Sequence, residues 1–218
     1  MEKITDENQR ERAAFIAHEI KNPLAVLKAN VQLIEPDYNG ENKKSFMTIY
    51  ECIDNINKLI SENMDYIKSE TVRGGSDAVK IMKMVLRKYS VAGKRNFGFK
   101  TDRETVPVRC EGKLLESLFE NLIKNAVEAT EEGDEINAEI RVRRGKAVIK
   151  ISDTGCGISD TELVRVSDLF YTTKKGGSGV GLFMCRRIAE QNGGRLKIEK
   201  NRPKGTKVTV ELGLKSGV

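Results

Sequence analysis

The sequence predicts an α+β protein of two domains, an antiparallel helical hairpin followed by an α/β sandwich. Two apolar repeats with helical spacing fill the first third of the chain, and a glycine-containing break follows them. Beyond the break, segments with strand-like alternation are mixed with helical segments, an order typical of helices on one face of a largely antiparallel sheet. We therefore expect a hairpin domain at residues 1–71 and a sandwich domain at residues 77–218.

Composition and charge narrow the functional classes. The chain of 218 residues is 39% hydrophobic and 32% charged, as is ordinary for a globular protein, and no apolar run is long enough to span a bilayer. The N-terminus is polar and carries no secretion signal, so we expect a cytoplasmic protein without a membrane span. The net charge of +6 suits an anionic partner such as a nucleotide. Basic residues are interleaved with 32 acidic ones, so no nucleic-acid partner is expected.

The first helix is expected from about residue 8 to residue 34, where a turn-rich segment follows. Its apolar residues recur at steps of three and four and form one stripe of Ile16, Ile20, Leu24, Leu27, Val31 and Ile34. His18 lies roughly 170° from the centre of that stripe and should face outward, with Asn22 one turn further on the same side. Pro23 removes a backbone hydrogen bond and should kink the helix.

His18 is the only histidine of the chain, and Glu19 follows it directly. Near pH 7 a neutral imidazole keeps one nitrogen lone pair free, and a carboxylate that accepts the proton of the other nitrogen makes it a better nucleophile. Glu19 is a candidate for that base. Judged on these residues alone, an exposed helix histidine without a role is the simpler explanation.

A second helix is expected over residues 46–67. Its apolar residues also alternate steps of three and four, at Phe46, Ile49, Ile53, Ile56, Ile60, Met64 and Ile67. Two helices cannot enclose a core, so a hairpin with an apolar seam on each arm should pair with a second copy into a homodimeric four-helix bundle. Packing against the second domain of the same chain is the alternative.

The second domain follows a hinge at residues 72–77. Asp77 should cap a helix that ends near Tyr89. The remaining elements are, in order, a strand at 96–101, a helix at 113–130, strands at 135–143 and 146–152, a helix at 179–192, and a closing hairpin of strands at 195–199 and 206–212.

Two asparagines stand one turn apart on the helix expected at 113–130. Asn121 and Asn125 share a face in an otherwise apolar stretch. Amide oxygens suit a hard cation, and magnesium takes few protein ligands because phosphates and water complete its shell. The pair is therefore a candidate magnesium site, although two asparagines at a solvent boundary explain the pattern equally well without other residues.

A strand runs into a glycine-rich turn that presents Asp153. Gly155 and Gly157 follow the aspartate and allow close approach of a ligand to the backbone. A carboxylate at this place can accept the exocyclic amine of adenine. The same Asp-Thr-Gly sequence also opens the active site of aspartic proteases, but a single copy would require a symmetric dimer and would leave the asparagines unexplained.

The segment 174–182 is rich in glycine and leads into a helix. Free backbone N–H groups at a helix N-terminus favour phosphate. The segment is not a Walker loop, because Leu182 stands where that loop requires lysine. Nor do its glycines have the dinucleotide-binding spacing.

The segment from His18 to Leu24 resembles the phospho-acceptor box of bacterial two-component sensor histidine kinases. It matches the pattern His-Glu-hydrophobic-x-Asn/Thr-Pro-Leu at every position. The segments around Asn125, Asp153, Thr172 and Gly181 are similar, in that order, to the N, G1, F and G2 boxes of the ATP-binding domain shared by histidine kinases, gyrase and heat-shock chaperone ATPases.

This ATP-domain resemblance extends to Gly205 and Thr206, which match its last element. The chain departs from the pattern at residues 167–170, where many relatives read Phe-Glu-Pro-Phe, and in a short lid before Gly177. These departures concern the movement of the lid and not the binding of ATP.

The resemblance implies a protein histidine kinase that uses ATP and Mg²⁺, phosphorylates His18 and passes the phosphoryl group to an aspartate of a response-regulator receiver domain. It gives catalytic roles to His18, Glu19 and Asn22, with Asn22 orienting water in a regulator phosphatase reaction, and it places the metal on Asn125 and Asn121. The nucleotide-binding residues that it implies are Asn121, Lys124, Asn125, Asp153, Gly155, Gly157, Lys174, Gly177, Gly179, Gly181, Leu182 and Thr206.

Few residues precede His18, so we expect the input to arrive through a separate sensor or inhibitor protein, unless the chain is a truncated kinase core. Two functional alternatives remain. The first is a phosphotransferase that relays phosphate through His18 without ATP. The second is an ATPase or serine kinase of the same superfamily, to which the histidine box gives no support.

Overall fold

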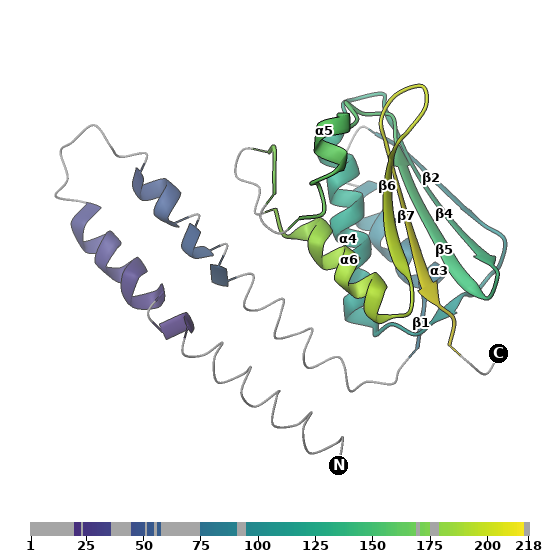
Figure 1. The fold of residues 1–218 in the computed structure, drawn as a ribbon, viewed down its shortest axis with the longest axis horizontal. Coiled ribbons are helices and arrows are strands. Elements are labelled where there is room, and N and C mark those ends of the chain that lie inside the picture. The colour runs from purple at the N-terminus through teal and green to yellow at the C-terminus, as the bar shows by residue number, and fades with distance from the viewer. Residues whose placement is uncertain are drawn as a thin grey trace, which may run out of the picture. The chain divides into compact units, whose positions relative to one another are not determined.

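A computed structural model describes residues 20–22, 24–35, 45–50, 52–54, 56–57, 75–90, 95–168, 171–174 and 179–215. The chain divides into two compact units, residues 1–71 and 72–218. The described residues of the first unit are helical, and the second unit combines helices with a sheet (Figure 1). The predicted α+β class, a helical region followed by an α/β sandwich, is confirmed.

The described part of the first unit is an antiparallel helical pair. Residues 24–34 form one helical run, and helical residues recur between 45 and 57. Lys28 Nζ lies 2.8 Å from Asp54 Oδ1, and the Tyr50 hydroxyl donates to Glu35 Oε2 at 2.8 Å. From the first pair to the second, the residue number rises from 28 to 35 on one arm and falls from 54 to 50 on the other, so the two arms run in opposite directions. His18, Glu19 and the predicted helix ends near residues 8 and 67 lie outside the described residues.

In the part of each arm that the structure describes, one large apolar side chain is buried. Val31 and Ile53 are 7% and 1% exposed. Other large apolar side chains of the unit remain exposed, namely Ile20, Val26, Leu27, Leu33, Ile34, Met47 and Ile56.

The second unit is built on a five-stranded sheet. Its strands are β2 (Asn96–Thr101), β4 (Glu135–Arg143), β5 (Lys146–Asp153), β6 (Arg195–Lys200) and β7 (Thr206–Gly213). They lie in the order β2-β4-β5-β7-β6. Only the β2–β4 pair is parallel, so the sheet is largely antiparallel, as predicted.

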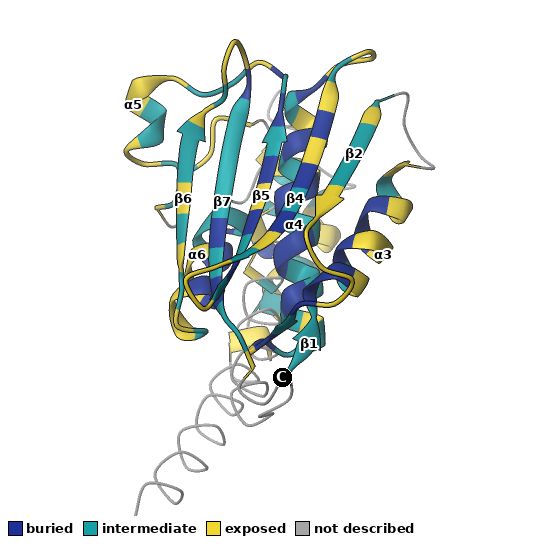
Figure 2. Cartoon of the chain, turned by 90° about the vertical axis from the view of Figure 1, so that its right-hand side faces the viewer, coloured by how far each residue is buried: buried dark blue, intermediate teal, exposed yellow. Residues whose placement is uncertain are grey.

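Three helices cover one face of this sheet: α3 (Ala78–Ser90), α4 (Gly112–Ala129) and α6 (Gly181–Gln191) (Figure 1). Helix α4 packs against both others. It buries one face, made of Leu115, Leu118, Phe119, Leu122, Ile123 and Ala126. Alternate residues of the central strands belong to the same hydrophobic core, including Ile136, Ile140, Ile149 and Leu212. Figure 2 shows buried and exposed positions alternating along β4. Full burial of one such side chain contributes about 1.5–3 kcal/mol, so this layer holds the sandwich together.

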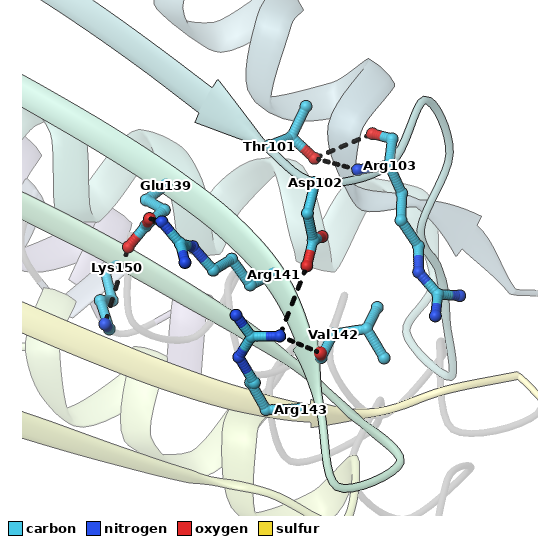
Figure 3. Close-up of polar contacts among 8 residues, drawn as sticks. All are labelled: Thr101, Asp102, Arg103, Glu139, Arg141, Val142, Arg143 and Lys150. Atoms are coloured by element: carbon cyan, nitrogen blue, oxygen red, sulfur yellow. Dashed lines mark hydrogen bonds and ion pairs between the residues drawn. The ribbon is translucent and has the colours of Figure 1, made fainter.

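The opposite face of the sheet is polar. Glu139 lies between Arg141, at 2.5 Å, and Lys150, at 3.6 Å, and Asp102 lies 3.8 Å from Arg143 (Figure 3). Exposed ion pairs of this kind contribute about 0–1 kcal/mol each. The outer face therefore keeps the sheet in contact with solvent and adds little to its stability.

Three short elements of the second unit were not predicted from the sequence. Strands β1 (Ser76–Asp77) and β3 (Pro107–Val108) form a separate two-stranded sheet, and helix α5 (Asp160–Leu163) has one turn. None is long enough to show a periodicity. Among the described residues, no helix has both the length and the apolar character that crossing a bilayer requires.

Asp77 caps helix α3, as predicted, and also holds the chain that returns to β3. Its Oδ1 accepts hydrogen bonds from the backbone N–H groups of Val79, at 3.0 Å, and Val106, at 2.9 Å. Loss of a helix cap costs about 1 kcal/mol, and the second bond adds to that.

We therefore predict that Asp77→Ala lowers the free energy of unfolding by about 1–2 kcal/mol, measured by urea denaturation. Lys80→Ala, at an exposed position of the same helix, is the control and should change it by less than about 0.5 kcal/mol. Equal effects of the two substitutions would show that the cap is not formed.

Candidate functional site

Helix α4 presents a polar face on the side opposite its buried residues. Asn121 and Asn125 are half-buried one turn apart, and Glu128 follows, exposed, three residues later. The buried stripe of α4 determines this arrangement, because side chains between its apolar positions must point away from the sheet.

Lys174 reaches this polar face from the segment that precedes α6. Its Nζ donates to Asn125 Oδ1 at 3.1 Å and to Glu128 Oε2 at 2.5 Å. Thr172 Oγ1 accepts the backbone N–H of Lys174 at 3.1 Å, which shapes the turn that presents the lysine. Lys124 Nζ lies 3.7 Å from Glu128 Oε1. Glu128 thus stands between two lysines, of which only Lys174 also contacts Asn125.

Asn121 lies against the first residue of α6. Its Nδ2 donates to the Ser117 carbonyl at 2.9 Å. A Cβ at Gly181 would lie 2.9 Å from Asn121 Oδ1, so the absence of a side chain at Gly181 lets the two helices approach here. Leu182 packs partly against the hydrophobic core.

Asp153 ends strand β5 and is 5% exposed. Its Oδ1 accepts hydrogen bonds from the backbone N–H groups of Gly155, at 3.0 Å, and Thr206, at 3.1 Å. Within the described part of the chain, Oδ2 has no hydrogen-bond partner. Burial raises the pKa of Asp153 above its usual value, and the two N–H donors act against this rise. A buried acceptor without a donor is costly, so Oδ2 is suited to a donor from a ligand.

The glycines around Asp153 are needed by the protein's own packing. Gly205 has φ +102°, and a Cβ there would lie 1.9 Å from the Asp153 carbonyl oxygen. At Gly155 a Cβ would lie 2.0 Å from the Ala129 carbonyl oxygen. The sequence suggested that Gly155 and Gly157 allow a ligand to approach the backbone; in addition, Gly155 and Gly205 let backbone pack on backbone. The backbone N–H of Cys156 also donates to the Ala129 carbonyl, at 2.9 Å. These contacts attach the loop after Asp153 to the end of α4.

The structure brings several of the predicted residues together in pairs. Asn125 contacts Lys174, Asp153 contacts Gly155 and Thr206, and Asn121 lies against Gly181, as described above. A Cβ at Gly157 would lie 3.2 Å from the Gly205 carbonyl oxygen, so these loops also meet. Gly179 has φ +66°, which favours glycine.

For the other predicted site residues, the structure shows little contact with the rest of the site or does not describe them. Lys124 is exposed and pairs only with Glu128 among the described residues. Asn22 is exposed in the helical unit. Gly177, like His18 and Glu19, lies outside the described residues.

Two residues of the site were missed in the sequence. Glu128 shares the face of Asn121 and Asn125, a spacing that could have revealed it. Asn201 donates its Nδ2 to the Asp153 carbonyl at 2.8 Å and gave no sequence signal, because it lies 48 residues away in a turn.

The donor set fits a nucleotide with magnesium. Among the described residues, no group of three or more His, Cys, Asp or Glu side chains could hold a metal alone. An ion here would depend on the Asn125 amide oxygen together with ligand phosphates and water, which is the way magnesium usually binds. The buried Asp153 Oδ2 meets the need of an exocyclic amine on a purine.

Comparisons with known proteins agree with this geometry. The family described as Histidine kinase-, DNA gyrase B-, and HSP90-like ATPase matches residues 110–216, and the His Kinase A (phospho-acceptor) domain matches residues 8–71. Sporulation kinase E of Bacillus subtilis is 30% identical over 93% of this chain and 28% of its own length. Sporulation kinase D of the same organism is 31% identical over 92% of this chain and 41% of its own length.

Among solved structures, the catalytic domain of histidine kinase ThkA is similar with a TM-score of 0.56 and 27% identity, over 63% of this chain and 92% of that one. The chain spans less than half the length of the two sporulation kinases, with 28% and 41% covered. Along the chain, the match to the phospho-acceptor domain is followed by the match to the ATPase family. The chain therefore belongs to the two-component sensor histidine kinases, of which it is a catalytic core.

Proposed function

We propose that the protein binds Mg²⁺ and ATP in its second unit, transfers the γ-phosphoryl group to His18, and passes it to an aspartate of a response-regulator receiver domain in the cytoplasm. The observation that carries the nucleotide part is the buried carboxylate of Asp153, with one oxygen held by two backbone N–H groups and the other left for a ligand. A phosphotransferase that does not use ATP has no need of this arrangement.

Adenine recognition rests on Asp153 and its surroundings. The Gly155 and Thr206 N–H groups hold Oδ1, so Oδ2 is oriented before the ligand arrives. Such preorganisation reduces the ordering cost of binding. An ionised carboxylate accepts the adenine N6 amine and repels the O6 carbonyl of guanine, which gives a preference for ATP over GTP.

Phosphate binding and metal binding rest on α4 and the segment before α6. Asn125 would hold Mg²⁺, which when bound neutralises charge on the phosphate oxygens. Lys174 lies beside Asn125 and supplies a further positive charge. Asn121, Lys124, Gly177, Gly179 and Gly181 complete the proposed contacts. Phosphoryl transfer needs little more than positioning and charge stabilisation, both of which this set of groups can provide.

Phosphoryl acceptance rests on the first unit. His18 lies within the region that matches the phospho-acceptor domain, and we assign the attack to its Nε2. Glu19 would accept the proton of the other ring nitrogen and keep the attacking lone pair free. Asn22, which is exposed, would orient water in a phosphatase reaction on the regulator.

A homodimer accounts for the exposed apolar side chains of the hairpin. Leu33, Ile34 and Val26 are 73%, 58% and 61% exposed in the single chain. Patches of this kind mark interaction surfaces, and a second hairpin related by two-fold symmetry would cover them in a four-helix bundle.

We predict that His18→Gln abolishes labelling of the protein by radioactive ATP, because glutamine offers no nucleophilic nitrogen. Nucleotide affinity, measured by calorimetry, should not change. In the unchanged protein the label should be lost in acid and retained in base, as a phosphoimidazole requires. Labelling that persists in the variant would exclude His18 as the acceptor.

We predict that Asp153→Asn weakens ATP binding about 10- to 100-fold, the value of a hydrogen bond to a charged group. Asparagine can keep the Oδ1 acceptor for Gly155 and Thr206 but replaces Oδ2 with a donor, so the preference for ATP over GTP should shrink. Burial raises the pKa of Asp153, so its ionised form opposes folding at neutral pH, and this penalty disappears as the pH falls through that pKa. Thermal unfolding at neutral pH should therefore show the variant to be no less stable than the unchanged protein. If its affinity for ATP is also unchanged, Asp153 is not part of the nucleotide site.

We predict that Gly205→Ala destabilises the protein more than Gly133→Ala does. The backbone φ is +102° at Gly205 and +92° at Gly133, so the strain of an alanine at either position costs about 1 kcal/mol. Only at Gly205 does a Cβ meet other atoms, which adds about 1–3 kcal/mol and displaces Asp153. Urea denaturation and ATP calorimetry measure both effects. Equal behaviour of the two variants would show that the contact does not position Asp153.

A further inference from the structure

The ammonium group of Lys174 occupies the amide oxygen that the proposed function gives to Mg²⁺. Its Nζ lies 3.1 Å from Asn125 Oδ1 and 2.5 Å from Glu128 Oε2. We call this pair of contacts the Lys174 bridge. Lys174 lies 49 residues after Asn125 in the sequence and 46 residues after Glu128.

The bridge and a metal ion exclude one another on simple electrostatic grounds. Magnesium binds oxygen at about 2.1 Å, so an ammonium bonded to the same amide oxygen would lie within a few ångströms of a divalent cation. Repulsion between such like charges at short range exceeds the strength of a neutral-acceptor hydrogen bond. Lys174 must therefore leave Asn125 before Mg²⁺ can bind there.

Glu128 stabilises the bridge because it is the charged partner of Lys174. The two side chains are 37% and 42% exposed, so solvent weakens their pairing and Lys174 can exchange Glu128 for another anion. Lys124 lies further from Glu128, at 3.7 Å, and leaves one carboxylate oxygen to Lys174.

The segment that carries Lys174 makes a further contact through Tyr171. The Arg165 guanidinium lies 4.6 Å from the centre of the Tyr171 ring. With the Thr172 contact to the Lys174 backbone, this restricts the chain from residue 171 to residue 174. The lysine is therefore presented to α4 by a shaped turn.

On the basis of the proposed function, we infer that the Lys174 bridge is a latch that closes the metal position when no nucleotide is bound. Phosphate oxygens offer Lys174 a second partner of the same charge as Glu128. A nucleotide that draws Lys174 away frees Asn125 for Mg²⁺ and releases Glu128, so metal and nucleotide enter together. Glu128 acts on the metal position through Lys174, and by holding the lysine there it opposes binding of the metal.

The test is the affinity of the full chain for Mg·ADP, a ligand that allows no phosphoryl transfer, measured by calorimetry in Glu128→Gln. Glutamine keeps the shape of the side chain and removes the charge that holds Lys174. The latch predicts tighter binding, by about two- to fivefold, the range for loss of an exposed ion pair. If Glu128 instead supported the bound metal or its water shell, the same substitution would weaken binding.

Glu120→Gln is the matched control. Glu120 lies on the same helix and is paired equally closely, with Lys88 at 2.5 Å. Among the described residues, Lys174 Nζ is bonded to Asn125 and Glu128 and not to Glu120. Glu120→Gln should leave the affinity for Mg·ADP unchanged. A gain as large as that of Glu128→Gln would show a general charge effect and overturn the latch.

A second variant separates the latch from other effects of the lost charge. In a Lys174→Met background there is no bridge to break, so adding Glu128→Gln should change the affinity by less than about 1.5-fold, within the usual limit of additivity. A gain that persists in this background overturns the inference. If the unchanged protein does not bind Mg·ADP at all, the proposed function fails as well, whereas normal binding with no gain in Glu128→Gln overturns the latch alone.

Discussion

The packing of α4 between the sheet and its neighbouring helices is the constraint on which the rest of the second unit depends. Its apolar stripe, from Leu115 to Ala126, is almost fully buried, and this burial fixes how the helix is rotated about its axis. Asn121, Asn125 and Glu128 must then face away from the sheet. The same packing positions the Ala129 carbonyl at the end of the helix. This carbonyl accepts a hydrogen bond from the Cys156 N–H and so holds the loop after Asp153. The site is thus a consequence of how the core is packed.

Asp153 on the one hand, and Asn125 with Lys174 on the other, lie in different electrostatic environments. Asp153 is a buried acid whose charge is supported by two N–H groups on one oxygen, which leaves the other oxygen available for a ligand amine. Asn125 and Lys174 lie near the surface, where charge is less costly and exchange of partners is easier. A rigid, buried contact suits a base that must be recognised. A loose, exposed contact suits phosphates and metal that must enter and leave.

The sequence predicted the parts of the fold that have a strong repeat. Helix α4 and the alternating strands β4, β5 and β7 lie close to their expected positions, because a buried face imposes a period on the sequence. Strands β1 and β3 have two residues each and could not show one. In the site, Asn125 and Asp153 stood out by motif, but the Lys174 bridge did not. Its partners are brought together by the fold alone, and the role of Gly155 and Gly205 in backbone packing depends on contacts that no local pattern records.

The central claim is that the free oxygen of Asp153 recognises the amine of adenine. Its most direct test compares the affinity of the protein for ATP with that for purine riboside triphosphate, which differs only in lacking the exocyclic amine. The account predicts that the analogue binds at least about tenfold more weakly, because a buried charged acceptor is then left without a donor. Equal affinity for the two ligands would contradict it.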